Sequence, residues 1–278
     1  MIRPDLHLHT TASDGVYDVD ALARLVQRAD VTLFSVTDHD TLAALPQAVS
    51  AAYDRGLAFI PGVEISTEGC EDVHILGYGV RPQDPVLTQK FSEIAKERKD
   101  RITAMADRLK ELGLPLPMDE IGQEAGASIG RPHLARAMMK LGYVASAEEA
   151  FDKYIGRGRP AYVPRRNMTA TQAVSLLRER GAVPVLAHPG LLKWPMERLL
   201  PMLDAWQDAG LMGLEVYHPA NSDNYPAWDR LARQRRLLVT GGSDFHDGAS
   251  SRAQIGETVA AWRSALEDGW ALFEAARK

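Results

Sequence analysis

The feature that most constrains the fold is an alternation of strand-like and helix-like segments at both ends of the chain. Short β-branched or apolar runs such as Thr32–Thr37 and Val183–Ala187 follow segments with helical periodicity, here Asp18–Ala29 and Thr169–Arg180. Repeated units of this kind favour a parallel sheet with helices on its faces, so we expect an α/β protein, either a closed barrel or an open wound sheet. The other expected elements are strands over residues 5–9, 59–65, 73–78, 213–217 and 237–241, and helices over residues 42–55, 196–209, 225–235 and 264–277.

The stretch of residues 87–166 breaks this alternation. It has helical patterns throughout, with Gly and Pro at its turns, and residues 90–166 carry a net charge of +4, whereas the remainder carries −9. We therefore predict a body of residues 1–86 and 167–278 with an inserted helical lid domain of residues 87–166. A basic lid on an acidic body suits the binding of an anion, although a solvated helical decoration would show the same charges.

Composition excludes several classes of protein. The formal net charge of −5 does not indicate a general nucleic-acid-binding surface, and no apolar run is long enough to span a membrane. The first residues do not form an apolar signal segment, and a single cysteine, Cys70, excludes an intramolecular disulfide. These observations predict a cytoplasmic protein without membrane attachment.

Histidines and carboxylates gather where the expected strands end. His7 and His9 alternate with leucines in the first strand, so both imidazoles point to one face, about 7 Å apart. In an α/β barrel the carboxyl ends of the strands form one rim, where active sites lie, so we expect the later side chains to meet there. These are His39, Glu64, His74, His188, His218, Asp244 and His246.

The types of side chain in this set indicate a metal centre. Imidazole and carboxylate ligands without thiolate favour Zn, Mn or Fe. Glu64 lies between two histidine-bearing strands, which makes it the natural carboxylate to bridge two ions. Asp14 precedes Gly15, and its spacing alone does not separate a ligand from an ordinary turn residue.

Several of these segments occur in an order that resembles the PHP (polymerase and histidinol phosphatase) family. The resemblance covers nearly the whole chain, and two motifs of the insertion, Gly130-Arg131-Pro132-His133 and Gly158-Arg159-Pro160-Ala161-Tyr162-Val163, look like those of a stand-alone branch. That branch includes 3′,5′-nucleoside bisphosphate phosphatases and a bacterial protein proposed to trim RNA 5′ ends. The motifs that carry the resemblance are Asp5-Leu6-His7-Leu8-His9-Thr10, Thr11-Ala12-Ser13-Asp14-Gly15, Thr37-Asp38-His39-Asp40, Pro61-Gly62-Val63-Glu64, Val73-His74-Ile75, Ala187-His188-Pro189 and Gly242-Ser243-Asp244-Phe245-His246.

The resemblance implies a distorted, TIM-like (β/α)7 barrel with an inserted helical lid and a site for three divalent ions, Mn, Fe or Zn. The first ion would be held by His7, His9, Glu64 and Asp244. The second would be held by Glu64, His74 and His188, and the third by Asp14, His39 and His246. Every one of these positions carries a suitable side chain in this sequence.

Together with the metal-ligand pattern, the resemblance implies a phosphatase that hydrolyses a phosphate monoester of a small nucleotide, of the 3′,5′-nucleoside bisphosphate type, through a metal-bound hydroxide. Arg131 and Arg159 are the expected phosphate clamps, because a guanidinium matches phosphate in a bidentate way. His133 is a further candidate for substrate contact. We expect His218 and Asp244 to be the catalytic residues, with His218 either protonating the leaving oxygen or binding phosphate.

Two alternatives stay open at the level of the sequence. The substrate could be another phosphoester, such as histidinol phosphate, a cyclic nucleotide or the 5′ end of a short single-stranded RNA cut by a 5′–3′ exonuclease. A non-catalytic metal-binding regulatory domain is the other class, and the complete set of ligands in a stand-alone chain argues against it. The sequence indicates no obligatory protein partner.

Overall fold

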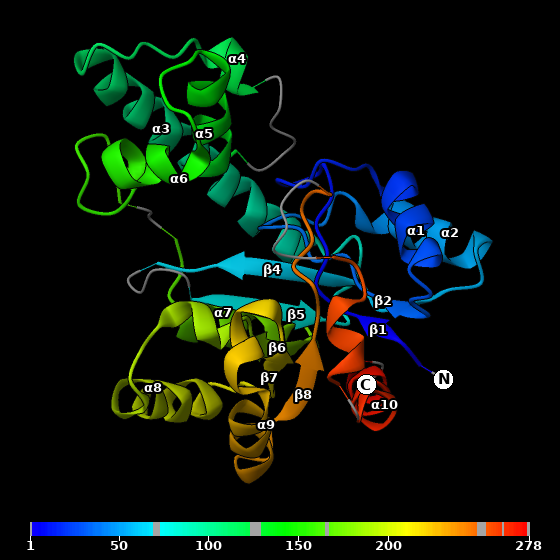
Figure 1. Cartoon of the computed structure of the whole chain (residues 1–278). Coiled ribbons are helices and arrows are strands. Elements are labelled where there is room, and N and C mark those ends of the chain that lie inside the picture. The colour runs from blue at the N-terminus through cyan, green and yellow to red at the C-terminus, as the bar shows by residue number, and fades with distance from the viewer. Residues whose placement is uncertain are drawn as a thin grey trace.

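Eight short strands form two sheets in the structure, a computed structural model that describes residues 2–68, 73–122, 129–164, 167–248, 254–262 and 264–276. One sheet has the order β1-β2-β3 and the other β4-β5-β6-β7-β8 (Figure 1). Cys70 lies outside the described residues. The strands are β1 (Pro4–Asp5), β2 (Leu33–Phe34), β3 (Ala58–Phe59), β4 (Gly62–Ser66), β5 (His74–Tyr78), β6 (Val183–Leu186), β7 (Gly213–Tyr217) and β8 (Leu238–Gly241).

The fold is of the α/β class, as expected. The expectation that all strands run parallel is wrong for β5. This strand runs antiparallel to both β4 and β6. Only seven residues separate β4 from β5, too few for the crossover helix that a parallel pair requires, so the chain turns back directly. The remaining neighbours, including β6-β7 and β7-β8, are parallel.

Hydrogen bonds join the two sheets at two places, although no closed sheet is found among the described residues. At one, Leu6 donates to the Gly241 carbonyl and Asp244 donates to the His7 carbonyl. At the other, His39 and Glu64 form an isolated parallel bridge. A Cβ at Gly242 would collide with the backbone and Cβ of His7, so glycine is what allows the first of these close approaches.

Helices cover the strands on the outside (Figure 1). Six of them follow the expected pattern within a few residues, and each buries an apolar face against the main core. Helix α7, for example, starts with a reciprocal capping box between Thr169 and Gln172 and buries Val174 and Leu177. The six are α1 (Val19–Arg28), α2 (Leu45–Asp54), α7 (Ala170–Glu179), α8 (Met196–Asp208), α9 (Tyr225–Gln234) and α10 (Ala265–Ala276).

The segment that interrupts the pattern is helical, as expected, and is carried by the long helix α3 (Pro85–Glu111). Leu87, Phe91 and Ile94 of α3 belong to the main core, whereas Ile102 and the following apolar residues belong to a second, smaller core. The helices α4 (Met118–Gly122), α5 (Arg131–Lys140) and α6 (Ala147–Ala150) gather beside the far half of α3 (Figure 1). No helix in the described ranges is both long and apolar enough to cross a membrane.

We expect Asp84→Ala to destabilise the protein, because Asp84 caps α3 and thereby anchors the whole helical segment. Its Oδ1 accepts hydrogen bonds from the backbone of Val86 and Leu87, and its Oδ2 pairs with Arg180. Loss of such a cap costs about 0.5–2 kcal/mol in the free energy of unfolding, measurable by urea denaturation.

The pH dependence of this contribution follows from the pKa of Asp84. Burial opposes ionisation, but the backbone donors and Arg180 hold the pKa of Asp84 below its usual value. The contribution is therefore present above the pKa of an unfolded aspartate and is lost as the pH falls through the lower, folded pKa. An Asp84→Ala variant that is destabilised equally at pH 7 and at acidic pH would contradict this role.

Candidate metal centre

The structure brings all nine predicted ligands together at one end of the strands. Nitrogen and oxygen atoms of eight of them belong to overlapping groups whose members lie within 4.8 Å of one another, and His188 joins these through its contact with Glu64. Exposure of the side chains rises from 0% at His7 and His9 to 30% at His246, so the cluster is buried on one side and open on the other. The printed groups are His9, Asp14, His39 and His246; His7, His9, Glu64 and Asp244; His39, Glu64 and His74; and His7, Glu215 and His218.

Two of the nine reach the cluster differently from the expectation that the ligands after the first strand lie at the ends of later strands. Glu64 lies in the middle of β4, and His74 is the first residue of β5. Because β5 runs in the reverse direction, its start lies beside the carboxyl ends of the parallel strands. A ligand at the start of this strand therefore meets ligands that follow the others, such as His188 after β6.

The carboxylate of Glu64 is the centre of the cluster. Its Oε1 lies 2.8 Å from His74 Nδ1 and 2.9 Å from His188 Nε2. Its Oε2 lies 3.2 Å from His7 Nε2, 3.3 Å from His9 Nε2 and 3.1 Å from His39 Nδ1. A single buried carboxylate thus touches five imidazoles from four separate segments of the chain.

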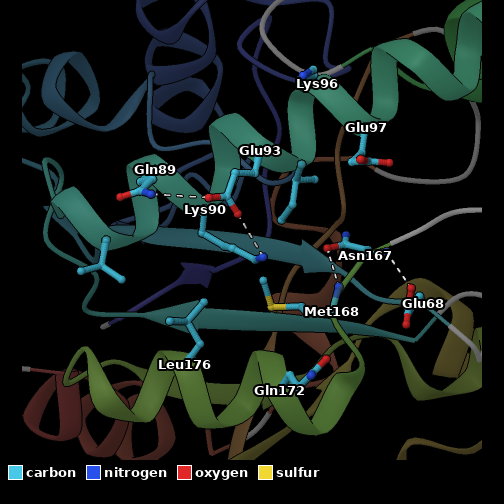
Figure 2. Close-up of a pocket in the computed structure, with 12 residues that line it drawn as sticks. Glu68, Gln89, Lys90, Glu93, Lys96, Glu97, Asn167, Met168, Gln172 and Leu176 are labelled. Carbon is cyan, nitrogen blue, oxygen red and sulfur yellow. Dashed lines mark hydrogen bonds and ion pairs between the residues drawn. The ribbon is translucent and has the colours of Figure 1, made fainter.

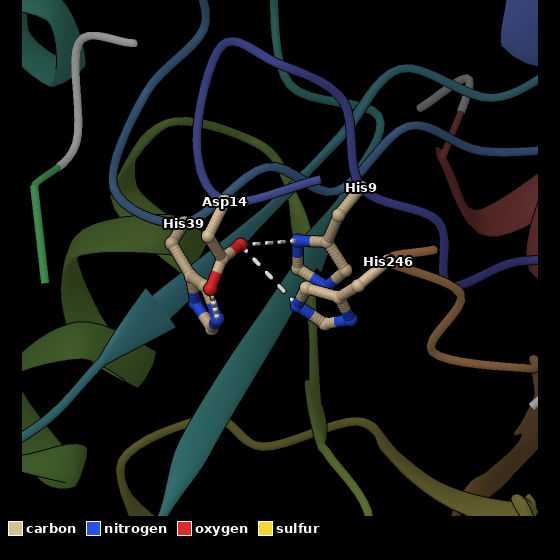
Figure 3. A group of neighbouring side chains, drawn as sticks. All are labelled: His9, Asp14, His39 and His246. Carbon is tan, nitrogen blue, oxygen red and sulfur yellow. Dashed lines mark ion pairs between the residues drawn. The ribbon is translucent and has the colours of Figure 1, made fainter. Parts of the chain in front are cut away.

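Two aspartates continue the cluster toward its open side. Asp244 Oδ1 lies 3.1 Å from His9 Nε2 and 3.3 Å from His7 Nε2. Figure 3 shows Asp14 facing the imidazoles of His9, His39 and His246, and its Oδ1 lies 3.2 Å from His246 Nε2. The alternative that Asp14 is an ordinary turn residue does not account for these three neighbours.

Electrostatics keep the carboxylates charged. Burial alone would raise their pKa values, but the surrounding imidazoles hold the pKa of Glu64, Asp14 and Asp244 well below the ordinary range. Burial lowers the pKa of His39, which favours the neutral imidazole that can bind a cation. Burial opposes charge on His9 as well, yet the negative charges of Asp244 and Glu64, which lie close to its Nε2, raise its pKa to about 10, so the cluster strongly attracts positive charge.

The donor set fits divalent cations. His7 Nδ1 faces the carboxylate of Glu215, which can only accept, so in the neutral imidazole Nε2 carries the lone pair and points at Glu64 and Asp244. Within the described part of the chain, five buried atoms of the nine clustered side chains make no hydrogen bond, namely His7 Nε2, both ring nitrogens of His9, Glu64 Oε2 and His188 Nδ1. When the imidazoles are neutral, electron-rich atoms this close together need a cation between them to offset their repulsion.

Backbone strain accompanies the site. His188 and Asp244 adopt positive φ values of 26° and 56°, and Asp40, beside His39, has a φ of 49°. Such conformations are costly for residues other than glycine and persist where surrounding contacts impose them, commonly at functional sites.

The four predicted substrate-contacting residues fall into two sets. His218 belongs to the cluster: the backbone N–H of Ala220 donates to its Nδ1, and its Nε2 lies 3.4 Å from Asp244 Oδ2. Arg131, His133 and Arg159 lie in the helical segment. The guanidinium of Arg131 lies over the rings of Phe151 and Tyr162, His133 is buried at the start of α5, and Arg159 is exposed.

Sequence reasoning missed two residues beside the cluster. Glu215 is fully buried in β7 and touches His7, and a charged residue inside the apolar run Gly213–Tyr217 was the available signal. Arg98 of α3 is buried too, pairs with Asp40 and donates to Ser66 Oγ at 2.9 Å. Ser66 Oγ in turn lies 3.3 Å from His39 Nδ1, so a short polar chain connects the helical segment to a predicted ligand.

A separate groove lies between α3 and α7 (Figure 2). It has a volume of about 1180 Å³ and is lined by charges of both signs, with Lys90 and Glu93 of α3 paired across one side. None of the nine predicted ligands lines it, so the chemistry of this protein is assigned to the histidine cluster instead.

Comparison with known proteins agrees with the geometry. The family model described as PHP domain matches residues 5–100. The chain is 34% identical to the 5′-3′ exoribonuclease Rnm of Escherichia coli, with 97% of this chain and 93% of that protein covered. It is 32% identical to the 3′,5′-nucleoside bisphosphate phosphatase of Chromobacterium violaceum, with 93% and 92% covered. The chain belongs to the PHP family.

Two solved structures are similar to this chain over nearly its whole length. An amidohydrolase from Chromobacterium violaceum with bound sulfate and no metal superposes with a TM-score of 0.85 at 29% identity, over 92% of this chain and 90% of that one. A candidate metal-dependent phosphoesterase from Bifidobacterium adolescentis gives a TM-score of 0.80 at 28% identity, over 93% and 94%. The predicted class of this PHP protein, a metal-dependent phosphoric ester hydrolase, is thereby confirmed.

The buried pair of Arg98 and Asp40 should matter for the stability of this PHP protein. Arg98→Met and Asp40→Asn each leave one buried partner without its counter-charge, which costs about 3–5 kcal/mol in similar cases. We expect each variant to lose stability of this order in urea denaturation with a chelator present, and the double variant to lose less than the sum. Strictly additive losses would show that the two side chains do not interact.

Arg24→Met provides the matched control. Arg24 pairs with Asp20 on the exposed face of α1. Exposed pairs of this kind contribute about 0–1 kcal/mol, so this variant should unfold close to the parent.

Proposed function

We propose that this enzyme removes a phosphate group from a small nucleotide of the 3′,5′-nucleoside bisphosphate type, with three divalent ions, Mn, Fe or Zn, held by the nine clustered side chains. The observation that carries the proposal is the buried Glu64 carboxylate in contact with five imidazoles. Such an arrangement has no evident use in a structural core, because an apolar cluster would fill the same space without the cost of burying charge.

The contacts among the nine side chains support three metal sites. His7, His9, Glu64 and Asp244 form one close group, and Asp14, His39 and His246 lie together with His9 in another. His74 and His188 both approach Oε1 of Glu64, which supports a third site that shares this carboxylate. When bound, the ions would supply an activated water and neutralise charge on the phosphate.

His218 is suited to donate the proton that the leaving oxygen needs. Its Nδ1 accepts from the Ala220 backbone, so a neutral His218 carries its proton on Nε2. That atom lies 3.4 Å from Asp244 Oδ2, at the edge of the cluster. The role of Asp244 is then to hold His218 as well as to contribute a ligand.

We further propose that residues 87–166 act as a lid that carries substrate contacts on Arg131, His133 and Arg159. The net positive charge of this segment supports an anionic ligand. The seven strands other than β3, joined by the two sets of hydrogen bonds between the sheets, would form the distorted barrel beneath it.

Degradation of short RNA from its 5′ end is the second candidate function. It is favoured by the 34% identity to the Escherichia coli exoribonuclease over 97% of this chain. A terminal nucleotide with two phosphate positions is chemically close to a nucleoside bisphosphate, so one site could accept either.

A substrate panel separates these candidates. The metal-loaded protein should hydrolyse nucleoside 3′,5′-bisphosphates with a higher kcat/KM than cyclic nucleotides, histidinol phosphate or 5′-labelled RNA oligonucleotides. Elemental analysis should find three ions per chain, and removal of these ions with a chelator should abolish turnover. A higher kcat/KM for oligonucleotides would establish the exoribonuclease instead, and a metal-loaded protein without any phosphoesterase activity would overturn both.

His188→Ala should abolish turnover in the same assay, because the imidazole that faces Glu64 is lost. Tyr53→Ala, at an exposed position of α2, is the control and should retain full activity.

The proton-donor role of His218 can be tested through the leaving group. His218→Asn keeps an acceptor for the Ala220 backbone, because Asn Oδ1 can take the place of Nδ1, but it cannot deliver the proton from Nε2. We expect kcat for a nucleotide substrate to fall by about 10²–10⁴-fold. The loss should be much smaller for p-nitrophenyl phosphate, whose leaving group needs no protonation; equal losses on both substrates would rule out this role.

A further inference from the structure

Glu215 is a carboxylate whose position suggests a function outside the nine predicted ligands. It is the third residue of β7 and has no exposed surface. Its Oε1 lies 3.0 Å from His7 Nδ1, and its Oε2 accepts a hydrogen bond of 2.7 Å from the backbone N–H of His188. Each oxygen is therefore bonded to a different predicted ligand, one through its ring and one through its backbone.

The contact with His7 determines how that imidazole faces the cluster. Since a carboxylate accepts only, the shared proton sits on Nδ1 of His7. The ring is then held with Nε2 pointing at Glu64 Oε2 and Asp244 Oδ1, 3.2 and 3.3 Å away. Carboxylates that hold metal-binding histidines in this way fix the tautomer and orientation and make the ligand more basic.

The contact with His188 acts on the backbone. His188 has φ 26° and ψ 59°, an unfavourable conformation for a residue with a side chain. A short hydrogen bond from its N–H to a buried charge can offset that cost. In this conformation His188 Nε2 reaches Glu64 Oε1 at 2.9 Å.

The side-chain amide of Asn221 provides a second connection between β7 and the loop that carries His188. Asn221 is buried, and its Nδ2 donates to the carbonyls of Glu215 and Val216. Its Oδ1 accepts from the backbone N–H of Gly190, two residues after His188. The end of β7 and the loop after β6 are thus connected both through the Glu215 side chain and through Asn221.

Glu215 is also close enough to His7 and His218 to be considered a direct ligand of a further ion. The hydrogen bonds argue against this, because both of its oxygens and Nδ1 of His7 are already engaged. His218 Nδ1 is likewise occupied by the Ala220 backbone, and its Nε2 lies near Asp244.

We propose that Glu215 is a positioning residue that holds the His7 imidazole and the His188 backbone, and so sets the affinity of the centre for its ions. This inference rests on the proposed metal-dependent function. In this role Glu215 of β7 would connect His7, near the start of the chain, with His188, in the loop after β6.

Glu215→Gln tests the proposal with little change in volume. The amide can accept from only one of the two donors, and it removes the negative charge. We expect the affinity for Mn²⁺, measured by titration calorimetry, to fall by about 10–100-fold, with a correspondingly smaller rise in Tm when Mn²⁺ is added. Activity should recover toward the parent value at saturating Mn²⁺, because the ligands themselves are intact.

Asp268→Asn is the matched control. Asp268 is also a buried carboxylate with several hydrogen bonds, but its partners are Arg233, Trp262 and Ser264 near the end of the chain. This variant should lower the Tm of the metal-free protein and leave the affinity for Mn²⁺ unchanged.

The outcomes separate the two proposals. A parent protein that binds none of Mn²⁺, Fe²⁺ and Zn²⁺ would overturn the metal-dependent function. A parent that binds Mn²⁺, together with a Glu215→Gln variant of equal affinity, would overturn only the role of Glu215. Permanent loss of one ion even at saturating Mn²⁺ would make Glu215 a direct ligand and would also overturn it. Should Glu215→Gln fail to fold, Glu215→Asp keeps the charge but is too short to reach both donors, and the same fall in affinity is expected.

Discussion

The rest of this structure depends on the burial of one carboxylate among histidines. Glu64 has no exposed surface and lies against five imidazoles, and Asp14 and Asp244 add two further charges within the same small volume. Burying such charges without compensation would cost several kcal/mol each. Divalent cations would provide this compensation, which explains how the protein can accommodate so polar an interior. We therefore expect metal binding to increase the stability of this region.

The direction of one strand and the backbone conformation of two residues bring these charged side chains together. Strand β5 reverses direction, which brings His74 beside side chains that follow parallel strands. His188 and Asp244 adopt backbone conformations with positive φ that are unfavourable for residues with a side chain, and the backbone N–H of His188 donates to the Glu215 carboxylate. Contacts outside the nine ligands support some of them, because His7 lies against Glu215, His39 against Ser66, and the backbone N–H of His188 donates to Glu215.

The helical segment is coupled to the centre by a single long helix. The first half of α3 belongs to the main core and its second half to the smaller one, and Arg98 lies where the two meet. Through Asp40 and Ser66 this arginine is connected to His39. A ligand that moves the helical segment would thus alter the contacts of Arg98 with Asp40 and Ser66, and Ser66 is in contact with the predicted ligand His39.

The sequence by itself determined the α/β class, the helices and the identity of the ligand-bearing motifs, because periodicity and capping are local properties of the chain. His7 and His9 share a face simply because they are two residues apart in an extended segment. Only the tertiary structure decided that β5 runs antiparallel, that Glu64 lies within its strand and not at the end, and that Glu215 and Arg98 lie beside the cluster. These depend on pairings between residues far apart in the chain: 208 positions separate His7 from Glu215, and 58 separate Asp40 from Arg98. No local pattern records which distant donor a buried charge will meet, because that partner is chosen when the segments pack.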